Sequence, residues 1–153
     1  MDQKYAFANC QKIVLFRKNN SEVLLAKRRG ENDYDGVYSF VGGKMEITDG
    51  GIVEGLRREK NEEIGEEVKI KIWPIFNTMN YFVKKDRTNM VLPHYYARWE
   101  SGEINLSKEY SDYQWVEVNE LSQFEPKIET VEPMVNNLLR LINLVKEEEL
   151  IEI

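Results

Sequence analysis

Three glutamates near the middle of the chain have a spacing that suits shared chemistry. Glu59, Glu62 and Glu63 stand at positions i, i+3 and i+4, so on a helix all three would project from one face. Like charges at this spacing oppose one another by about 0.2–0.5 kcal/mol per pair, and the helix dipole adds negative charge at the same end. Carboxylates held against this repulsion suit a hard divalent cation, which prefers oxygen ligands. A solvated acidic face is the competing interpretation, because most charge runs are of that kind.

The glutamates close a stretch, residues 42–65, that begins with a glycine pair and ends with a glycine. The turn at residues 49–51 interrupts the pattern, so a helix is predicted to begin just after it and to end at Gly65. Lys60 lies on the row of this helix that should face a core, and it would have to extend its amine to solvent. The apolar members of the row are Ile52, Leu56 and Ile64.

Length, charge and cysteine content limit the classes of protein to which the chain can belong. The 153 residues predict a single domain over residues 1–153. A net charge of −6 argues against general binding to nucleic acids or membrane surfaces, since either needs a basic face. A phosphorylated small molecule stays possible, because a bound metal can reverse the local field. The single cysteine, Cys10, excludes an internal disulfide and suits a reducing compartment, so a cytoplasmic location is expected. The first ten residues lack the apolar segment of a secretory signal, and no stretch approaches the length of a membrane span.

The predicted elements follow the order strands, helix, strands, helix, without regular alternation. This order predicts an α/β (α+β) architecture in which a mixed β-sheet carries helices on its faces. The first two strands should form a hairpin, because residues 18–21 make a polar turn. A helix at residues 131–147 has the clearest helical period and is interpreted as a packing element. The predicted strands are residues 5–16, 22–28, 38–41, 67–83 with an interruption at Pro74, 90–99 and 114–118.

The stretch from Gly43 to Gly65 resembles a Nudix box, G-x5-E-x7-R-E-U-x-E-E-x-G-U, in which U is aliphatic. Residues 58–65 supply R-E-x-x-E-E-x-G in full, and Gly42-Gly43-Lys44 supplies the glycine entry. Residues 24–28 resemble the strand that precedes the box, and Trp115 followed by Glu120-Leu121 resembles the usual ending. The resemblance covers roughly residues 5–123 and implies a Nudix-like α/β/α sandwich with a mixed β-sheet.

The sequence departs from the box at a few positions. Asp49 stands where the family has its first glutamate, and eight residues rather than seven separate it from Arg58. An extra residue inside a helix would rotate one end by about 100° relative to the other. We expect Gly50-Gly51 to absorb it before the helix begins, which keeps the three glutamates in register and leaves the role of Asp49 open. Lys60 and Glu66 occupy positions that are usually aliphatic, so packing beneath the helix should differ.

The resemblance implies hydrolysis of a nucleoside diphosphate linked to another group, with water attacking a phosphoanhydride. Mg²⁺ or Mn²⁺ would bridge and neutralise the diphosphate oxygens. The later loop would supply one further acidic ligand, six residues before Trp115. The implied metal ligands are Glu59, Glu62, Glu63, Glu109 and the backbone carbonyl of Gly42.

The resemblance also suggests roles for basic side chains and for the general base. Arg58 is interpreted as holding a ligand carboxylate in position through charge-assisted hydrogen bonds, and a surface ion pair is its alternative role. Arg28 and Lys44 are candidates for phosphate contact, or else plain surface charge. Glu59 is the family-weighted general base. The expected catalytic residues are therefore Glu59, Glu62 and Arg58.

One histidine and several aromatic residues could also serve a binding site. His94, the only histidine, lies mid-strand and is interpreted as a buried histidine with satisfied hydrogen bonds. The aromatic residues are expected in the core and on sheet faces, and one of them could stack on a base. They are Tyr81, Phe82, Tyr95 and Tyr96.

Several questions stay open at the level of sequence. The strand at residues 90–99 and the residues after it resemble the MutT-like branch, which acts on nucleoside triphosphates. Nucleotide sugars, dinucleoside polyphosphates and capped RNA ends are alternative substrates. A non-catalytic nucleotide-sensing module and a structural divalent site are alternative functions, and the presence of all four acidic ligands favours the enzyme. A small-molecule nucleotide is the expected partner, and the chain could be a monomer or a homodimer.

Overall fold

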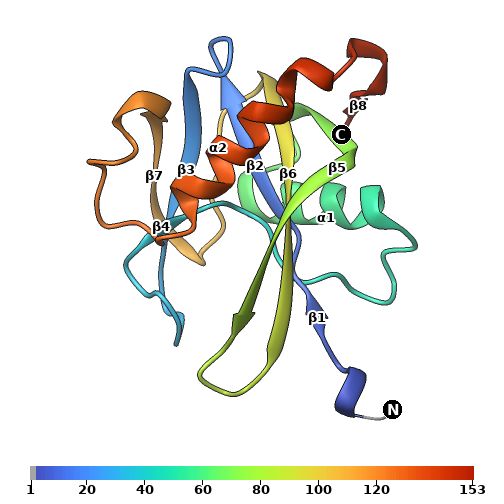
Figure 1. The fold of residues 1–153 in the computed structure, drawn as a ribbon, viewed down its shortest axis with the longest axis vertical. Coiled ribbons are helices and arrows are strands. Elements are labelled where there is room, and N and C mark those ends of the chain that lie inside the picture. The colour runs from blue at the N-terminus through green and yellow to red at the C-terminus, as the bar shows by residue number, and fades with distance from the viewer. Residues whose placement is uncertain (1–2) are drawn as a thin grey trace.

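One eight-stranded mixed sheet forms the centre of the computed structural model, which describes residues 3–153, and a helix lies against each face (Figure 1). The main strand order is β4-β3-β2-β6-β5-β8, with β1 beside β6 and β7 beside β3. Strands β1 and β2 run parallel to β6, and the other pairs are antiparallel. The predicted mixed sheet and sandwich are thus confirmed.

The strands and helices have the following bounds. The strands are β1 Ala8–Asn9, β2 Lys12–Arg17, β3 Glu22–Arg28, β4 Tyr38–Ser39, β5 Lys69–Val83, β6 Asn89–Ser101, β7 Tyr110–Glu117 and β8 Ile151–Glu152. The helices are α1 Ile52–Ile64 and α2 Val131–Leu141, with 3₁₀ turns at Gln3–Tyr5, Val118–Glu120, Ile142–Leu144 and Glu147–Glu149. Within residues 3–153, no helix is long and apolar enough to cross a membrane.

The predicted hairpin of β2 and β3 is confirmed, with Phe16 opposite Val23. The single strand predicted over residues 5–16 was wrong, because the chain forms a 3₁₀ turn and then two short strands on either side of Cys10 and Gln11. The amide of Gln11 donates to the carbonyl of Gly43 at 2.9 Å, so the glycine loop, Gly42-Gly43-Lys44, lies beside the break between β1 and β2.

Later boundaries also differ from the expectations. Strand β7 starts four residues before the predicted residue 114, because its whole length pairs with β3. The predicted interruption of β5 at Pro74 coincides with a shift of register between Ile72 and Asn77. Helix α2 ends at Leu141 instead of residue 147 and continues as a 3₁₀ turn. Strand β8 was not predicted, because two residues give no periodic pattern.

Adjacent residues of the sheet supply two separate cores. Ile13 and Leu15 pack with Leu56 and Ile64 of α1, whereas Val14 and Phe16 belong to the core beneath α2. Successive side chains of a strand point to opposite faces of the sheet, so neighbouring residues enter different cores. The buried rings of Tyr95 and Tyr96 divide in the same way between the α1 core and the α2 core.

Two residues of α1 lie differently from the prediction. Ile52 is exposed, because each step of four residues turns a helix by about 40° and so moves its first turn off the buried face. Lys60 does not reach solvent: it is 1% exposed, and its Nζ donates to the carbonyl of Val68 at 2.8 Å. Burial lowers the pKa of its amine. The chain turns back after Gly65 and brings this carbonyl within reach.

We expect Lys60→Ala to lower the free energy of unfolding by about 1–3 kcal/mol, because it removes buried methylenes and the donor to Val68. Urea unfolding measures this effect. The control is Arg57→Ala, an exposed position on the same helix, which should change stability by less than about 0.5 kcal/mol. Equal effects of the two substitutions would contradict a packing role for Lys60.

Candidate active site

All of the predicted site residues line one cavity of about 940 Å³. The polar face of α1 forms one wall, and the glycine loop, the end of β3, the loop before β7 and the β5–β6 hairpin contribute the others. The cavity therefore gathers side chains that lie far apart in the sequence. The predicted residues on its walls are Arg28, Gly42, Lys44, Arg58, Glu59, Glu62, Glu63 and Glu109.

The glycine pair lets the loop pass close to two neighbours. Gly42 has a φ of +128°, and a Cβ there would collide with the carbonyl oxygen of Gln11. A Cβ at Gly43 would collide with the carboxylate of Glu59, which is 5% exposed. The absence of a side chain at Gly43 therefore makes the space that this carboxylate occupies.

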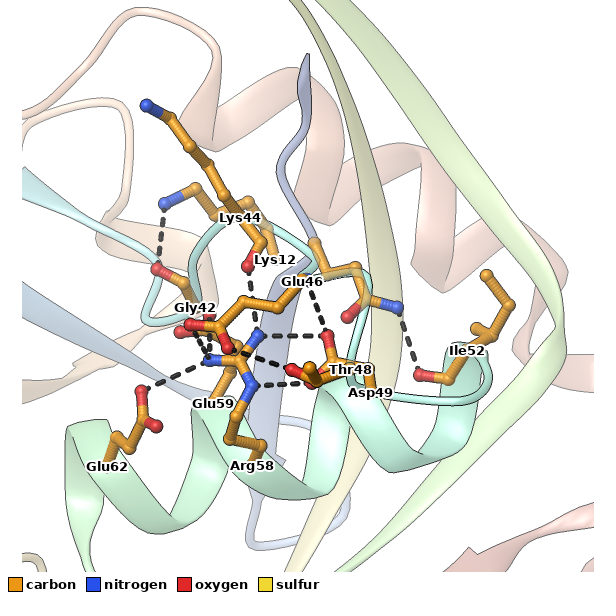
Figure 2. A network of polar contacts seen from close by, with 11 residues as sticks. Lys12, Gly42, Lys44, Glu46, Thr48, Asp49, Ile52, Arg58, Glu59 and Glu62 are labelled. Carbon is orange, nitrogen blue, oxygen red and sulfur yellow. Dashed lines mark hydrogen bonds and ion pairs between the residues drawn. The ribbon is translucent and has the colours of Figure 1, made fainter.

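Lys12 is a site residue that the sequence reasoning missed. Its side chain is buried on the cavity wall, and its Nζ donates to the carbonyl of Gly42 at 3.3 Å (Figure 2). The positive charge favours the ionised forms of Glu59 and Glu63. The sequence does show a lysine at the start of an apolar strand. Which residues this lysine contacts depends on how β2 pairs with other strands, and the sequence does not give that pairing.

The guanidinium of Arg58 contacts both Glu59 and Glu62 of α1 (Figure 2). Its Nη1 lies 2.8 Å from Glu59 Oε1 and 3.2 Å from Glu62 Oε2. Its Nη2 donates to the carbonyl of Lys44 at 2.9 Å, which ties the glycine loop to the helix. Arg58 thus contacts two of the predicted metal ligands.

The guanidinium of Arg58 also binds Asp49 and so holds this side chain in the site. Asp49 accepts from Arg58 Nε at 2.6 Å and from Nη2 at 3.0 Å, and its side chain is 2% exposed. It also accepts from the amide of Glu46 at 2.7 Å. The hydrogen bond from Arg58 lowers the pKa of Asp49 to about 2, so the carboxylate is ionised at neutral pH. Helix α1 begins at Ile52, after Gly50 and Gly51, so the extra residue lies in the loop.

Glu63 is a buried acidic residue with one oxygen that lacks a hydrogen-bond partner. It is 5% exposed, and its Oε2 has no hydrogen-bond partner. The pKa of Glu63 is raised to about 7, mainly by burial and also by the neighbouring Glu109, while a hydrogen bond with Tyr110 opposes the rise. Burial also raises the pKa of Glu59, which Arg58 opposes. A cation between these carboxylates would supply the missing positive charge.

The carboxylates lie along the wall and do not surround one point. Glu59 and Glu62 turn toward Arg58, whereas Glu63 lies beside Glu109. Among residues 3–153, no three acidic, histidine or cysteine side chains converge in the manner of a metal site. An ion at this wall would therefore compete with Arg58 for the oxygens of Glu59 and Glu62.

Arg28 is the basic counterpart of Glu63. Its side chain is 18% exposed, its Nε is buried without a hydrogen-bond partner, and its Nη2 lies 3.5 Å from Glu31. Lys44 is exposed at the cavity, and Lys84 is a further basic residue on the walls. An anion in the cavity would meet these groups.

The side of the cavity formed by the β5–β6 hairpin is more apolar. His94 is 3% exposed and places Nδ1 2.8 Å from the carbonyl of Leu92. Burial lowers the pKa of His94 to about 4, so the ring is neutral at pH 7. The rings of Tyr34 and Phe82 lie 5.7 Å apart and also line the cavity. A flat apolar group would fit against such surfaces.

Comparison with known proteins identifies both a family and a fold. The family model described as the NUDIX domain matches residues 11–138. No curated protein matches the sequence at a significant level.

Solved structures with a similar fold come from several organisms. A MutT protein from Methanosarcina mazei Go1 is 18% identical, with a TM-score of 0.72 over 88% of this chain and 94% of that one. The NUDIX domain of Shewanella oneidensis NrtR complexed with ADP ribose is 18% identical, with a TM-score of 0.70 over 95% and 94%. A C. elegans Ap4A hydrolase is 15% identical, with a TM-score of 0.72 over 90% and 99%. At these identities the likeness shows the fold alone.

We expect Gly43→Ala to weaken binding of a divalent cation at least about tenfold, because the new methyl group displaces the buried carboxylate of Glu59. Calorimetric titration with Mn²⁺ measures the affinity. The control is Gly51→Ala, whose Cβ meets only the exposed carboxylate of Glu54, so it should bind as the wild type does. Equal affinities for all three proteins would contradict a role for the glycine loop in shaping the site.

The raised pKa of Glu63 should make the metal-free protein less stable as the pH rises. Its neutral form is favoured in the folded state, so the contribution is complete below the ordinary pKa of 4.5 and is lost as the pH passes about 7. The loss should be on the order of 2 kcal/mol. Urea unfolding in EDTA at pH 5 and pH 8 tests this, with Glu63→Gln as the control because glutamine does not titrate. The same pH dependence in both proteins would show that Glu63 is not responsible.

Proposed function

Because the chain belongs to the Nudix family of hydrolases, we propose that it is a single-domain, metal-dependent pyrophosphohydrolase. It cleaves a phosphoanhydride in a nucleoside diphosphate linked to another group, and a nucleoside triphosphate is the favoured substrate. Mg²⁺ or Mn²⁺ is the proposed cofactor. A cytoplasmic location, expected from the single cysteine, belongs to the same proposal.

One observation carries the proposal: two buried polar atoms, one from an acidic and one from a basic side chain, lack hydrogen-bond partners on the walls of one cavity. They are Glu63 Oε2 and Arg28 Nε. Buried charged groups are normally hydrogen-bonded, and leaving one unpaired costs free energy. A divalent cation would give Glu63 Oε2 a partner, and a phosphate oxygen would accept a hydrogen bond from Arg28 Nε. A metal–diphosphate substrate supplies both.

The residues of the chain have distinct proposed roles in this reaction. A bound Mg²⁺ or Mn²⁺ would neutralise the diphosphate and make a bound water more acidic. Glu63 and Glu109 offer it oxygens, and so does the carbonyl of Gly42. Glu59 and Glu62, which pair with Arg58, would be further ligands to such an ion. Asp49 holds the guanidinium of Arg58 in the site through two hydrogen bonds.

The remaining groups bind and orient the nucleotide. Glu59, buried beside Gly43, is the proposed general base because burial raises its pKa above the ordinary value, which makes the carboxylate a stronger base. Arg28 and Lys44 are placed to contact phosphate oxygens. The apolar side of the cavity near Phe82 and His94 is the proposed place of the nucleoside.

A nucleotide-binding module without turnover is the second candidate function. Arg58 already pairs with Glu59 and Glu62, so those two charges need no metal. The NUDIX domain of Shewanella oneidensis NrtR is described in complex with ADP ribose, and a ligand of that kind is a reasonable candidate for such a module. The buried Glu63 Oε2, which has no hydrogen-bond partner, favours the enzyme, because a binding module does not need a further oxygen ligand for a catalytic metal.

Phosphate release from a panel of nucleotides tests the proposal. We expect release of orthophosphate or pyrophosphate with Mg²⁺ and none with EDTA. Glu62→Gln should lower kcat at least about a hundredfold, because it removes a negative charge at the metal. The Glu62 side chain is 56% exposed, so folding should be unaffected.

The matched control is Glu54→Gln, an exposed glutamate in the first turn of the same helix, which should keep wild-type turnover. Near-normal turnover in Glu62→Gln would remove Glu62 from the site. Nucleotide binding without turnover by the wild type would favour the binding module instead.

A further inference from the structure

The β5–β6 hairpin has two different faces beyond the part of the sheet that α1 covers (Figure 1). Asn80 and Phe82 pair with Leu92 and Met90, and all four line the cavity. The alternate residues of β5 point to the opposite face, on the same side of the sheet as α1. The register supports this, because Asn77 pairs with Tyr95 of the α1 core.

This opposite face is apolar and exposed. Phe7, Met79, Tyr81 and Val83 are 53%, 58%, 56% and 46% exposed, respectively. The rings of Phe7 and Tyr81 lie 6.3 Å apart, so the patch extends from β5 across β6 to the segment before β1. Tyr81 also reaches the rim of the cavity. We call these four side chains the hairpin patch.

The area of the hairpin patch matches what a stable interface needs. An aromatic side chain buries about 150–250 Å², so the exposed parts of Phe7 and Tyr81 amount to roughly 200 Å². Met79 and Val83 bring the total to roughly 300–500 Å², which is as large as the largest apolar patch on a typical monomer. A standard interface buries about 800 Å² per partner, of which about 56–58% is apolar. The patch therefore supplies the apolar share of one interface.

From this match we propose that the hairpin patch is the contact between two copies of this chain. Two equivalent sheet faces can pack on each other about a two-fold axis, so each patch meets the same residues in its partner. Such a contact covers the part of the sheet that α1 leaves bare. It needs no partner of different chemistry, and through Tyr81 it extends to the rim of the cavity.

Sedimentation or light scattering between about 1 and 100 μM tests the dimer, since interfaces of this size reach micromolar affinity or better. We expect the wild type to be a dimer in this range. Met79→Glu should raise the dissociation constant at least about a hundredfold, because it buries an unpaired charge in each copy. Val83→Glu should act in the same way, so the test does not depend on the folding of one variant.

The control is Leu144→Glu, which changes an exposed apolar residue on the 3₁₀ turn after α2 and should leave the dimer intact. Melting temperatures show whether each variant is folded. A wild type that stays monomeric throughout the range would overturn the proposal. A dimer that survives both Met79→Glu and Val83→Glu in folded protein would also overturn it.

Discussion

The ion pair between Arg58 and Asp49 is the contact on which the geometry of the site depends. It joins the loop that follows the glycine pair to the middle of α1 through two hydrogen bonds of 2.6 and 3.0 Å. A bidentate pair fixes the plane of a guanidinium as well as its position. The remaining donors of Arg58 can therefore reach Glu59, Glu62 and the carbonyl of Lys44 together. Without this ion pair, Arg58 would not be fixed in the position from which it connects Glu59 and Glu62 to the loop.

The residues of the site lower the stability of the folded chain in two places. A buried carboxyl with a raised pKa and a buried guanidinium nitrogen without a partner both cost free energy in the folded chain. Each cost falls on a cavity wall, at Glu63 and at Arg28. The other buried charges among residues 3–153 have partners, as Lys60 has in the carbonyl of Val68. Unsatisfied charge is therefore concentrated where a charged ligand can enter.

The sequence was sufficient for features set by local pattern. The limits of α1 follow from Gly51 and Gly65, and the three glutamates share the cavity because their spacing matches the helix period. It was insufficient for features set by distant contacts. Lys12 joins the site only because β2 brings it to the glycine loop, and Lys60 is buried only because the chain returns past it. The position of Asp49 depends on how the loop folds, which the extra residue before Arg58 left open.

The alternation of side chains along the β5–β6 hairpin has a consequence for how this segment can vary. Residues 80 and 82 face the cavity, whereas residues 79 and 83 face outward. A substitution at residue 80 or 82 leaves residues 79 and 83 in place, and the reverse also holds. The lining of the cavity and the outer surface can therefore change independently. Insertion of a single residue in β5 has a different effect, because it reverses every side chain beyond it. Such an insertion would turn Met79 toward the cavity and Asn80 toward water, so we expect insertions in this strand to come two residues at a time.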